Sequence, residues 1–79
     1  MKSIKEKTRT VLEGLTAKRP IKPKDRLKAD LGMDSIRITV LFIKAEEAYR
    51  IRFDNRDLIV RDSMTASDFQ ALIDKYCEK

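Results

Sequence analysis

The 79-residue sequence contains no histidine and only one cysteine, Cys77. A single cysteine cannot close a disulfide within the chain, which excludes a small secreted scaffold held together by disulfides. Without histidine, the chain has no imidazole base for a Ser–His or Cys–His catalytic pair. A structural zinc site needs several cysteine or histidine ligands, so the composition argues against one. We therefore predict a protein that is not an enzyme and read Cys77 as a partly exposed thiol.

Glycine and proline are also scarce, with two of each, whereas 42% of the residues are hydrophobic and 39% are charged. A β-sandwich needs more turn residues and more alternation of β-branched residues, so this composition favours helices. No run approaches the roughly 20 apolar residues of a membrane-spanning helix. The first ten residues lack the apolar run of a signal peptide. We expect one helical domain, 1–79, that is soluble, cytoplasmic and monomeric, with no stable membrane insertion.

The net charge of +5 is unevenly distributed along the chain. Residues 1–28 contain ten Lys or Arg and three Asp or Glu, whereas residues 29–79 contain eight and ten. A basic segment such as 18–28 could bind nucleic acid or anionic lipid. However, no aromatic residue lies in the basic half to stack on bases. We therefore favour a solvated basic face and no nucleic-acid partner, and keep binding as the alternative.

Apolar periodicity predicts helices at both ends of the chain. The first has one apolar face and a possible capping box formed by Ser3 and Glu6, and we expect it to end near Thr16 after Gly14. The last begins after Thr65, which has N-cap spacing to Asp68. The face of the first helix comprises Ile4, Thr8, Val11, Leu12 and Leu15. The face of the last comprises Phe69, Leu72, Ile73 and Tyr76.

A middle helix, from Ser35 to about Arg50, carries two apolar stripes. Such a helix is either buried all round or shared with a partner. The stripe that we assign to the core is Ile38, Leu41, Phe42, Ala45 and Tyr49. The second stripe is Ile36, Val40 and Ile43. Residues 51–64 are less regular, and we expect a turn at Asp54 and Asn55 and a short helix from Asp57 to Val60 whose Leu58 and Ile59 cover the bundle.

The connection at residues 17–34 is long for so small a domain. Pro20 and Pro23 prevent a regular helix there. Loops of this length are usually functional or disordered. The four apolar residues of this loop argue for function, because they can anchor it across the helices. They are Ile21, Leu27, Leu31 and Met33.

The loop ends in the run Asp30-Leu31-Gly32-Met33-Asp34-Ser35-Ile36. Gly32 suits a tight turn, and Ser35 stands where an N-cap residue would precede the middle helix. Asp34 lies beside the positive end of that helix. A serine that follows an aspartate is usually only a cap or a turn. As a cap, Ser35 should contribute about 1 kcal/mol, which its replacement by alanine would remove.

The run D-L-G-M-D-S-I, placed after a long loop and before an apolar helix, resembles the signature of the acyl carrier protein family. The resemblance extends over nearly the whole chain: a first helix, a long loop, a second helix, a short third segment and a closing helix. It implies an all-α, antiparallel four-helix bundle with three main helices, one short helix and a long first loop. It also implies that Ser35 receives 4′-phosphopantetheine from coenzyme A, with Asp34 as part of the recognised signature.

The same resemblance implies a set of partners. A separate phosphopantetheinyl transferase would attach the arm, and acyl-loading, acyl-transfer or condensing enzymes would exchange the cargo. The family's docking surface is the second helix, which assigns docking to Ile36, Arg37, Val40, Ile43 and Lys44. The cargo could be acyl, aminoacyl, peptidyl or a polyketide unit. A helical interaction module of the same fold that never receives the arm is the alternative.

Two departures from the family pattern bear on the pathway. Ile36 stands where leucine is commonest. Family members are typically acidic along the second helix, whereas this chain has Arg37 and Lys44 there and leaves Glu46 and Glu47 near the end of the helix. The charge argues against general fatty-acid synthesis, and we expect a specialised lipid or secondary-metabolite pathway.

Overall fold

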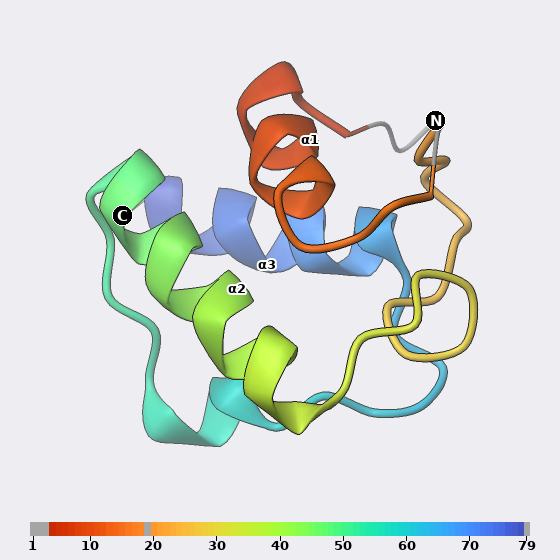
Figure 1. The fold of residues 1–79 in the computed structure, drawn as a ribbon. Coiled ribbons are helices and arrows are strands. Elements are labelled where there is room, and N and C mark those ends of the chain that lie inside the picture. Colours follow the sequence, from red (N-terminus) through yellow and green to blue (C-terminus); the bar gives the residue numbers. More distant parts are fainter. Residues whose placement is uncertain (1–3, 19, 79) are drawn as a thin grey trace.

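A computed structural model describes residues 4–18 and 20–78 of the chain, which form three α-helices and one short 3₁₀ helix (Figure 1). The helices are α1 (Glu6–Glu13), α2 (Ser35–Tyr49), η1 (Asn55–Leu58) and α3 (Ala66–Cys77). In this described part of the chain there is no strand, and a single isolated antiparallel bridge joins Arg26 to Thr65. The helical class predicted from the composition is therefore confirmed.

Helix α1 is shorter than the sequence predicted. It begins at Glu6 and ends at Glu13, before the expected end near Thr16. The backbone N–H of Gly14 is shared between the carbonyls of Thr10 and Val11, so the helix tightens and stops there. The proposed capping serine, Ser3, lies outside the described residues.

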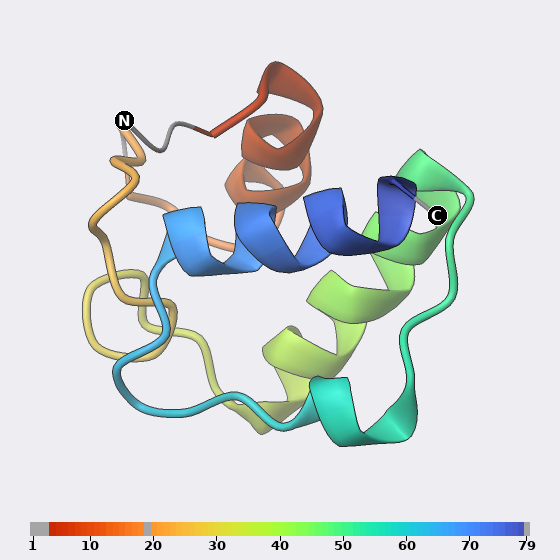
Figure 2. The same cartoon turned by 180° about the vertical axis from the view of Figure 1, so that it is seen from behind.

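The three α-helices pack around one apolar core. Helix α2 contacts both α1 and α3, and the two views show α3 crossing behind α2 with α1 at one edge (Figures 1 and 2). The core includes all four apolar residues predicted to anchor the loop, and four of the five residues of the predicted core stripe of α2; Tyr49 packs at its edge. The Thr8 hydroxyl is fully buried, lies 2.5 Å from the Tyr49 hydroxyl, and so links α1 to α2 through a hydrogen bond.

The long loop is tied to the start of α3 by backbone hydrogen bonds. The N–H groups of Ala66 and Ser67 donate to the carbonyls of Asp25 and Pro23, at 2.8 and 2.9 Å. The first N–H groups of a helix have no partner within the helix, so the loop satisfies donors that would otherwise need water. At Thr65 the predicted capping box with Asp68 is present. Figure 2 shows the loop lying beside the beginning of α3.

The prediction that Leu58 and Ile59 cover the bundle is wrong. Leu58 is 39% exposed and Ile59 is 77% exposed, and the short helix spans Asn55–Leu58 instead of residues 57–60. Phe53 takes the covering role: it is 7% exposed and packs edge-on against Phe42. Its backbone N–H donates to the Glu46 carboxylate, which fixes the extended segment so that the ring points inward.

A buried aspartate organises the middle of the loop. Asp25 accepts hydrogen bonds from the backbone N–H of Lys22 at 2.9 Å and forms an ion pair with Lys18 at 2.7 Å. Burial by itself raises the pKa of Asp25, but the Lys18 ammonium and the Lys22 N–H outweigh it, so the pKa is lowered. A buried carboxylate is retained only when such partners compensate its lost hydration.

This arrangement predicts an acid-sensitive loop. Because the folded-state pKa of Asp25 lies below the unfolded value near 3.8, its stabilising effect is fully present above that pH and disappears as the pH falls through the lower folded value. We expect Asp25→Asn to lower the Tm at pH 6 and to make the Tm fall less steeply than that of the parent below pH 4. Thermal melts followed by circular dichroism measure both effects. Parallel curves for the two proteins would contradict the assignment.

Candidate functional site

Buried side chains hold the segment before α2 in place on both sides of a turn. Leu31 and Met33 are buried, at 4% and 3% exposure, whereas Gly32 between them is exposed. Gly32 has a φ of 67°, a left-handed conformation that glycine adopts without strain. The backbone N–H of Met33 donates to the Leu27 carbonyl at 3.1 Å. The chain therefore leaves the core at a fixed point, and the next residues, 34–36, are exposed.

The residue that caps α2 is Asp34, which corrects the prediction that Ser35 is the N-cap. The Asp34 carboxylate accepts from the backbone N–H of Arg37 at 2.8 Å, and Ser35 is the first residue of the helix. Aspartate and serine are comparable as caps. The buried Met33 sets the phase of the chain, so the aspartate occupies the cap position.

As a result, the Ser35 hydroxyl remains available. Its backbone carbonyl accepts from the Thr39 hydroxyl at 2.9 Å, but no described residue forms a hydrogen bond with its side chain. Ser35 is exposed and lies in the first turn of a 15-residue helix, at the positive end of the helix dipole. The geometry presents a primary hydroxyl to solvent beside a helix N-terminus.

The corrected cap changes the expected stability effects. Replacing Asp34 with alanine should lower the free energy of unfolding by about 1 kcal/mol, because the N–H of Arg37 loses its partner. Asp34→Asn keeps an acceptor at the same place and should cost much less. Ser35→Ala should cost less than Asp34→Ala, in contrast to the sequence-based figure. Urea unfolding of the three variants tests this order. A larger loss of unfolding free energy for Ser35→Ala than for Asp34→Ala would indicate that Ser35 is the N-cap.

The second apolar stripe of α2 faces solvent. Ile36 is 72% exposed and Ile43 is 50% exposed, while Val40 between them is half-buried. The stripe begins next to Ser35 and runs for two turns along the side of the helix opposite its buried residues. Of the two alternatives that the sequence left open for α2, burial on all sides is therefore wrong, and one apolar face is free in this structure.

The two cations assigned to docking lie on a different side of α2. Arg37 lines a shallow pocket of about 340 Å³ with residues 14–17, and Lys44 lines another of about 400 Å³ with Val11 and Gly14. Both therefore face the end of α1. Glu47 lines the same pocket as Lys44 and offsets part of its charge. The structure thus separates the predicted docking residues into an apolar stripe and a basic flank.

Other chemistry is sparse in the part of the chain that the structure describes. No group of histidine, cysteine or acidic residues there could hold a metal ion. No described helix is long and apolar enough to cross a bilayer. Cys77 is exposed at the end of α3, as predicted. The Ser35 hydroxyl is exposed directly after the anchored loop.

Comparisons of the chain with protein-family models, curated proteins and solved structures returned no match. The resemblance to acyl carrier proteins therefore stays a prediction. It depends on the run from Asp30 to Ile36 and on the order of the helices.

Proposed function

We propose that this protein is an acyl carrier protein that holds its cargo as a thioester on a 4′-phosphopantetheine arm attached to Ser35. The observation that carries the proposal is the exposed Ser35 hydroxyl, which no described side chain or backbone group engages, at the first residue of α2. The loop before it is anchored by four buried apolar side chains, so the hydroxyl has a defined position. A defined and accessible hydroxyl is what a modifying enzyme requires of its substrate.

The attachment step needs little from this chain. The Ser35 oxygen would attack the phosphorus of coenzyme A that bears the pantetheine, forming a phosphodiester and breaking the pyrophosphate bond to release adenosine 3′,5′-bisphosphate. The hydroxyl proton passes to a base of the transferase, which also supplies Mg²⁺. Asp34 is engaged as the helix cap, so we assign it to positioning and recognition.

The proposal extends to the fold and the partners. We assign α1, α2, η1 and α3 to the four-helix bundle of carrier proteins, with residues 17–34 as its long first loop. The partners are a phosphopantetheinyl transferase and the enzymes that load and receive the cargo in the cytoplasm, with the protein acting as a monomer. Tethering would raise the effective concentration of the cargo at each partner. An aminoacyl or peptidyl cargo would use the same site.

The second candidate is a helical interaction module that never receives the arm. It is favoured by the exposed stripe of Ile36 and Ile43, which could bind a partner without any modification. Nucleic-acid binding by the basic loop has less support, because three of its cations are engaged. Lys18, Arg26 and Lys28 form ion pairs with Asp25, Asp30 and Asp62.

The deciding experiment is an intact-mass measurement after incubation with coenzyme A, Mg²⁺ and a transferase of broad specificity. One added arm per chain supports the carrier. An unchanged mass with several transferases that modify a known carrier in parallel reactions would favour the interaction module. A thiol-reactive probe used after reaction confirms that the new thiol is free, with Cys77→Ser removing the background from the exposed cysteine.

The basic flank of α2 predicts partner choice. Arg37 and Lys44 should repel the basic surfaces of enzymes adapted to acidic carriers, because like charges brought together lower affinity and slow encounter. We expect Arg37→Glu combined with Lys44→Glu to improve transfer by such an enzyme and to weaken transfer by the native partner. Both residues are exposed, so folding should change little. Both rate differences should shrink at high salt. Unaltered rates would assign partner choice to the apolar stripe.

A further inference from the structure

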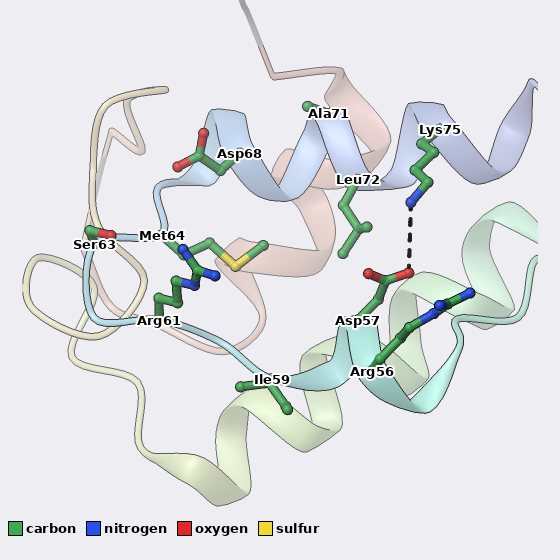
Figure 3. Close-up of a pocket in the computed structure, with 10 residues that line it drawn as sticks. All are labelled: Arg56, Asp57, Ile59, Arg61, Ser63, Met64, Asp68, Ala71, Leu72 and Lys75. Atoms are coloured by element: carbon green, nitrogen blue, oxygen red, sulfur yellow. Dashed lines mark ion pairs between the residues drawn. The ribbon is translucent and has the colours of Figure 1, made fainter.

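Residues 56–64 and the adjoining face of α3 line an open surface pocket of about 640 Å³ (Figure 3). No residue of α1 or α2 is among those that line it, so Ser35 is not part of it. Its apolar lining includes Ile59, Met64 and Leu72. The close-up shows the Met64 and Leu72 side chains extending into the space between the two segments. The pocket is within the size range of small-molecule sites in proteins.

The charged side chains that line this pocket differ in whether they already interact with another charged group. Its cations are Arg56, Arg61 and Lys75, and its carboxylates are Asp57 and Asp68. Asp57 forms an ion pair with Lys75, whereas the Asp68 carboxylate has only a neutral backbone N–H as its partner among the described residues. Asp57 accepts from the Tyr76 hydroxyl, and this hydrogen bond is the main cause that raises the pKa of Tyr76. The Asp57 carboxylate also lies 4.0 Å from the Lys75 ammonium. Asp68 accepts from the backbone N–H of Thr65 at 3.0 Å.

Arg61 differs from the other two cations. Lys75 is paired with Asp57, and Arg56 lies 3.8 Å from Asp54. The Arg61 guanidinium makes no ion pair or hydrogen bond with any described residue. In Figure 3 it rises from the lower segment toward α3, next to Met64. The lining thus holds three cations against two carboxylates, and the Arg61 guanidinium stands beside its apolar surface.

We propose that this pocket binds a small amphipathic anion, independently of the arm on Ser35. The head group, a carboxylate or an anion of similar geometry, pairs with Arg61, whose planar fork matches two oxygens. The apolar body covers Ile59, Met64 and Leu72, and its burial supplies most of the affinity. Ile59 is the most exposed large apolar side chain of the described residues, and a bound ligand would remove part of that surface from water.

Octanoate tests the proposal because it joins one carboxylate to a short apolar chain. Octyltrimethylammonium and 1-octanol have the same chain with a positive and a neutral head. The unmodified protein is titrated with each below micelle-forming concentrations and followed by ¹H–¹⁵N NMR. Octanoate should shift amides within residues 59–64 and 71–75 and bind more tightly than either control. Ser35→Ala should bind octanoate equally, so that a failure of the carrier proposal leaves this result unaffected.

Two sets of variants isolate the charge. Arg61→Gln should weaken octanoate binding about fivefold, the size expected for an exposed ion pair. Arg52→Gln removes an exposed arginine that is not among the pocket's lining residues and should change nothing. Ala71 lines the pocket and is exposed on α3. Ala71→Glu should weaken binding, whereas Ala71→Lys, with a side chain of similar length, should preserve or strengthen it.

The outcomes are separable. Equal binding of octanoate and octyltrimethylammonium, or equal losses from Ala71→Glu and Ala71→Lys, would overturn the assignment of an anion. Amide shifts confined to α2 would place the ligand on the exposed Ile36 and Ile43 stripe and overturn the assignment of the pocket. Circular dichroism of each variant checks that helix content is preserved.

Discussion

Replacing Ser35 with alanine should abolish phosphopantetheinylation while leaving the fold intact. The hydroxyl is the only group that the proposal modifies, so its removal leaves no acceptor. The Asp34 cap remains in place, and alanine is a strong helix former at the first position of α2. Intact mass after reaction with coenzyme A and transferase should show the unmodified chain. The circular dichroism spectrum and the melting curve should match those of the parent.

Matched controls make this result specific. Ser63→Ala removes another exposed serine, which lies in the turn before α3, and this variant should be modified like the parent. Asp34→Asn keeps the cap but removes the negative charge, so a slower rate with unchanged stability would assign the carboxylate to recognition by the transferase. Peptide mapping that places the arm on Ser3, Ser63 or Ser67 would refute the assignment of Ser35.

Replacing Phe42 with alanine should cost about 3–5 kcal/mol of folding free energy. Phe42 is 4% exposed, and its ring makes edge contacts with Phe53 and Phe69 at centroid distances of 5.2 and 5.4 Å. Truncation removes contacts that join α2 to α3 and to the segment before η1. Small domains have about 5–15 kcal/mol in total, so part of the population should be unfolded at 37 °C. Urea unfolding and the NMR spectrum measure the loss.

The adjacent residue in α2 provides the control. Ile43 is 50% exposed, and Ile43→Ala should change the free energy of unfolding by well under that of Phe42→Ala. If Phe42→Ala melts like the parent, the division of α2 into a core stripe and a free stripe is wrong. If Ile43→Ala destabilises as much as Phe42→Ala, Ile43 belongs to the core.

The helical faces were predictable because they depend on local periodicity. The buried residues of α2 and α3 recur at the spacing of a helix turn, and the predicted core residues Leu41, Phe42 and Phe69 are buried as expected. The loop anchors were also predictable, because a long loop in a small domain leaves few places for apolar side chains. The pattern could not show which backbone N–H each loop carbonyl would accept from. The Asp25 carbonyl, for example, accepts from the Ala66 N–H at the N-terminus of α3.

The cap of α2 shows how tertiary contacts decide between adjacent residues. Asp34 and Ser35 are both good caps, and the sequence cannot rank them. Burial of Met33 and its hydrogen bond to Leu27 place Asp34 at the cap and free the hydroxyl of Ser35. The role of Phe53 was hidden for a similar reason. It lies in an extended segment without helical periodicity, and the Glu46 side chain and the rings of Phe42, Phe69 and Tyr76 orient it inward.

By itself, the sequence determined the helical class and the two apolar stripes of α2, because composition and helical spacing are properties of short stretches of chain. The candidate serine came from the resemblance of the run from Asp30 to Ile36 to a family signature. The structure decided that the second stripe is exposed. The tertiary structure decided which acceptor caps α2, which aromatic ring covers the core and which cation stands unpaired beside an apolar pocket. Each of these depends on groups that are distant in sequence, such as Arg61 and Leu72, or Phe53 and Phe69, and that meet only after the loops are placed.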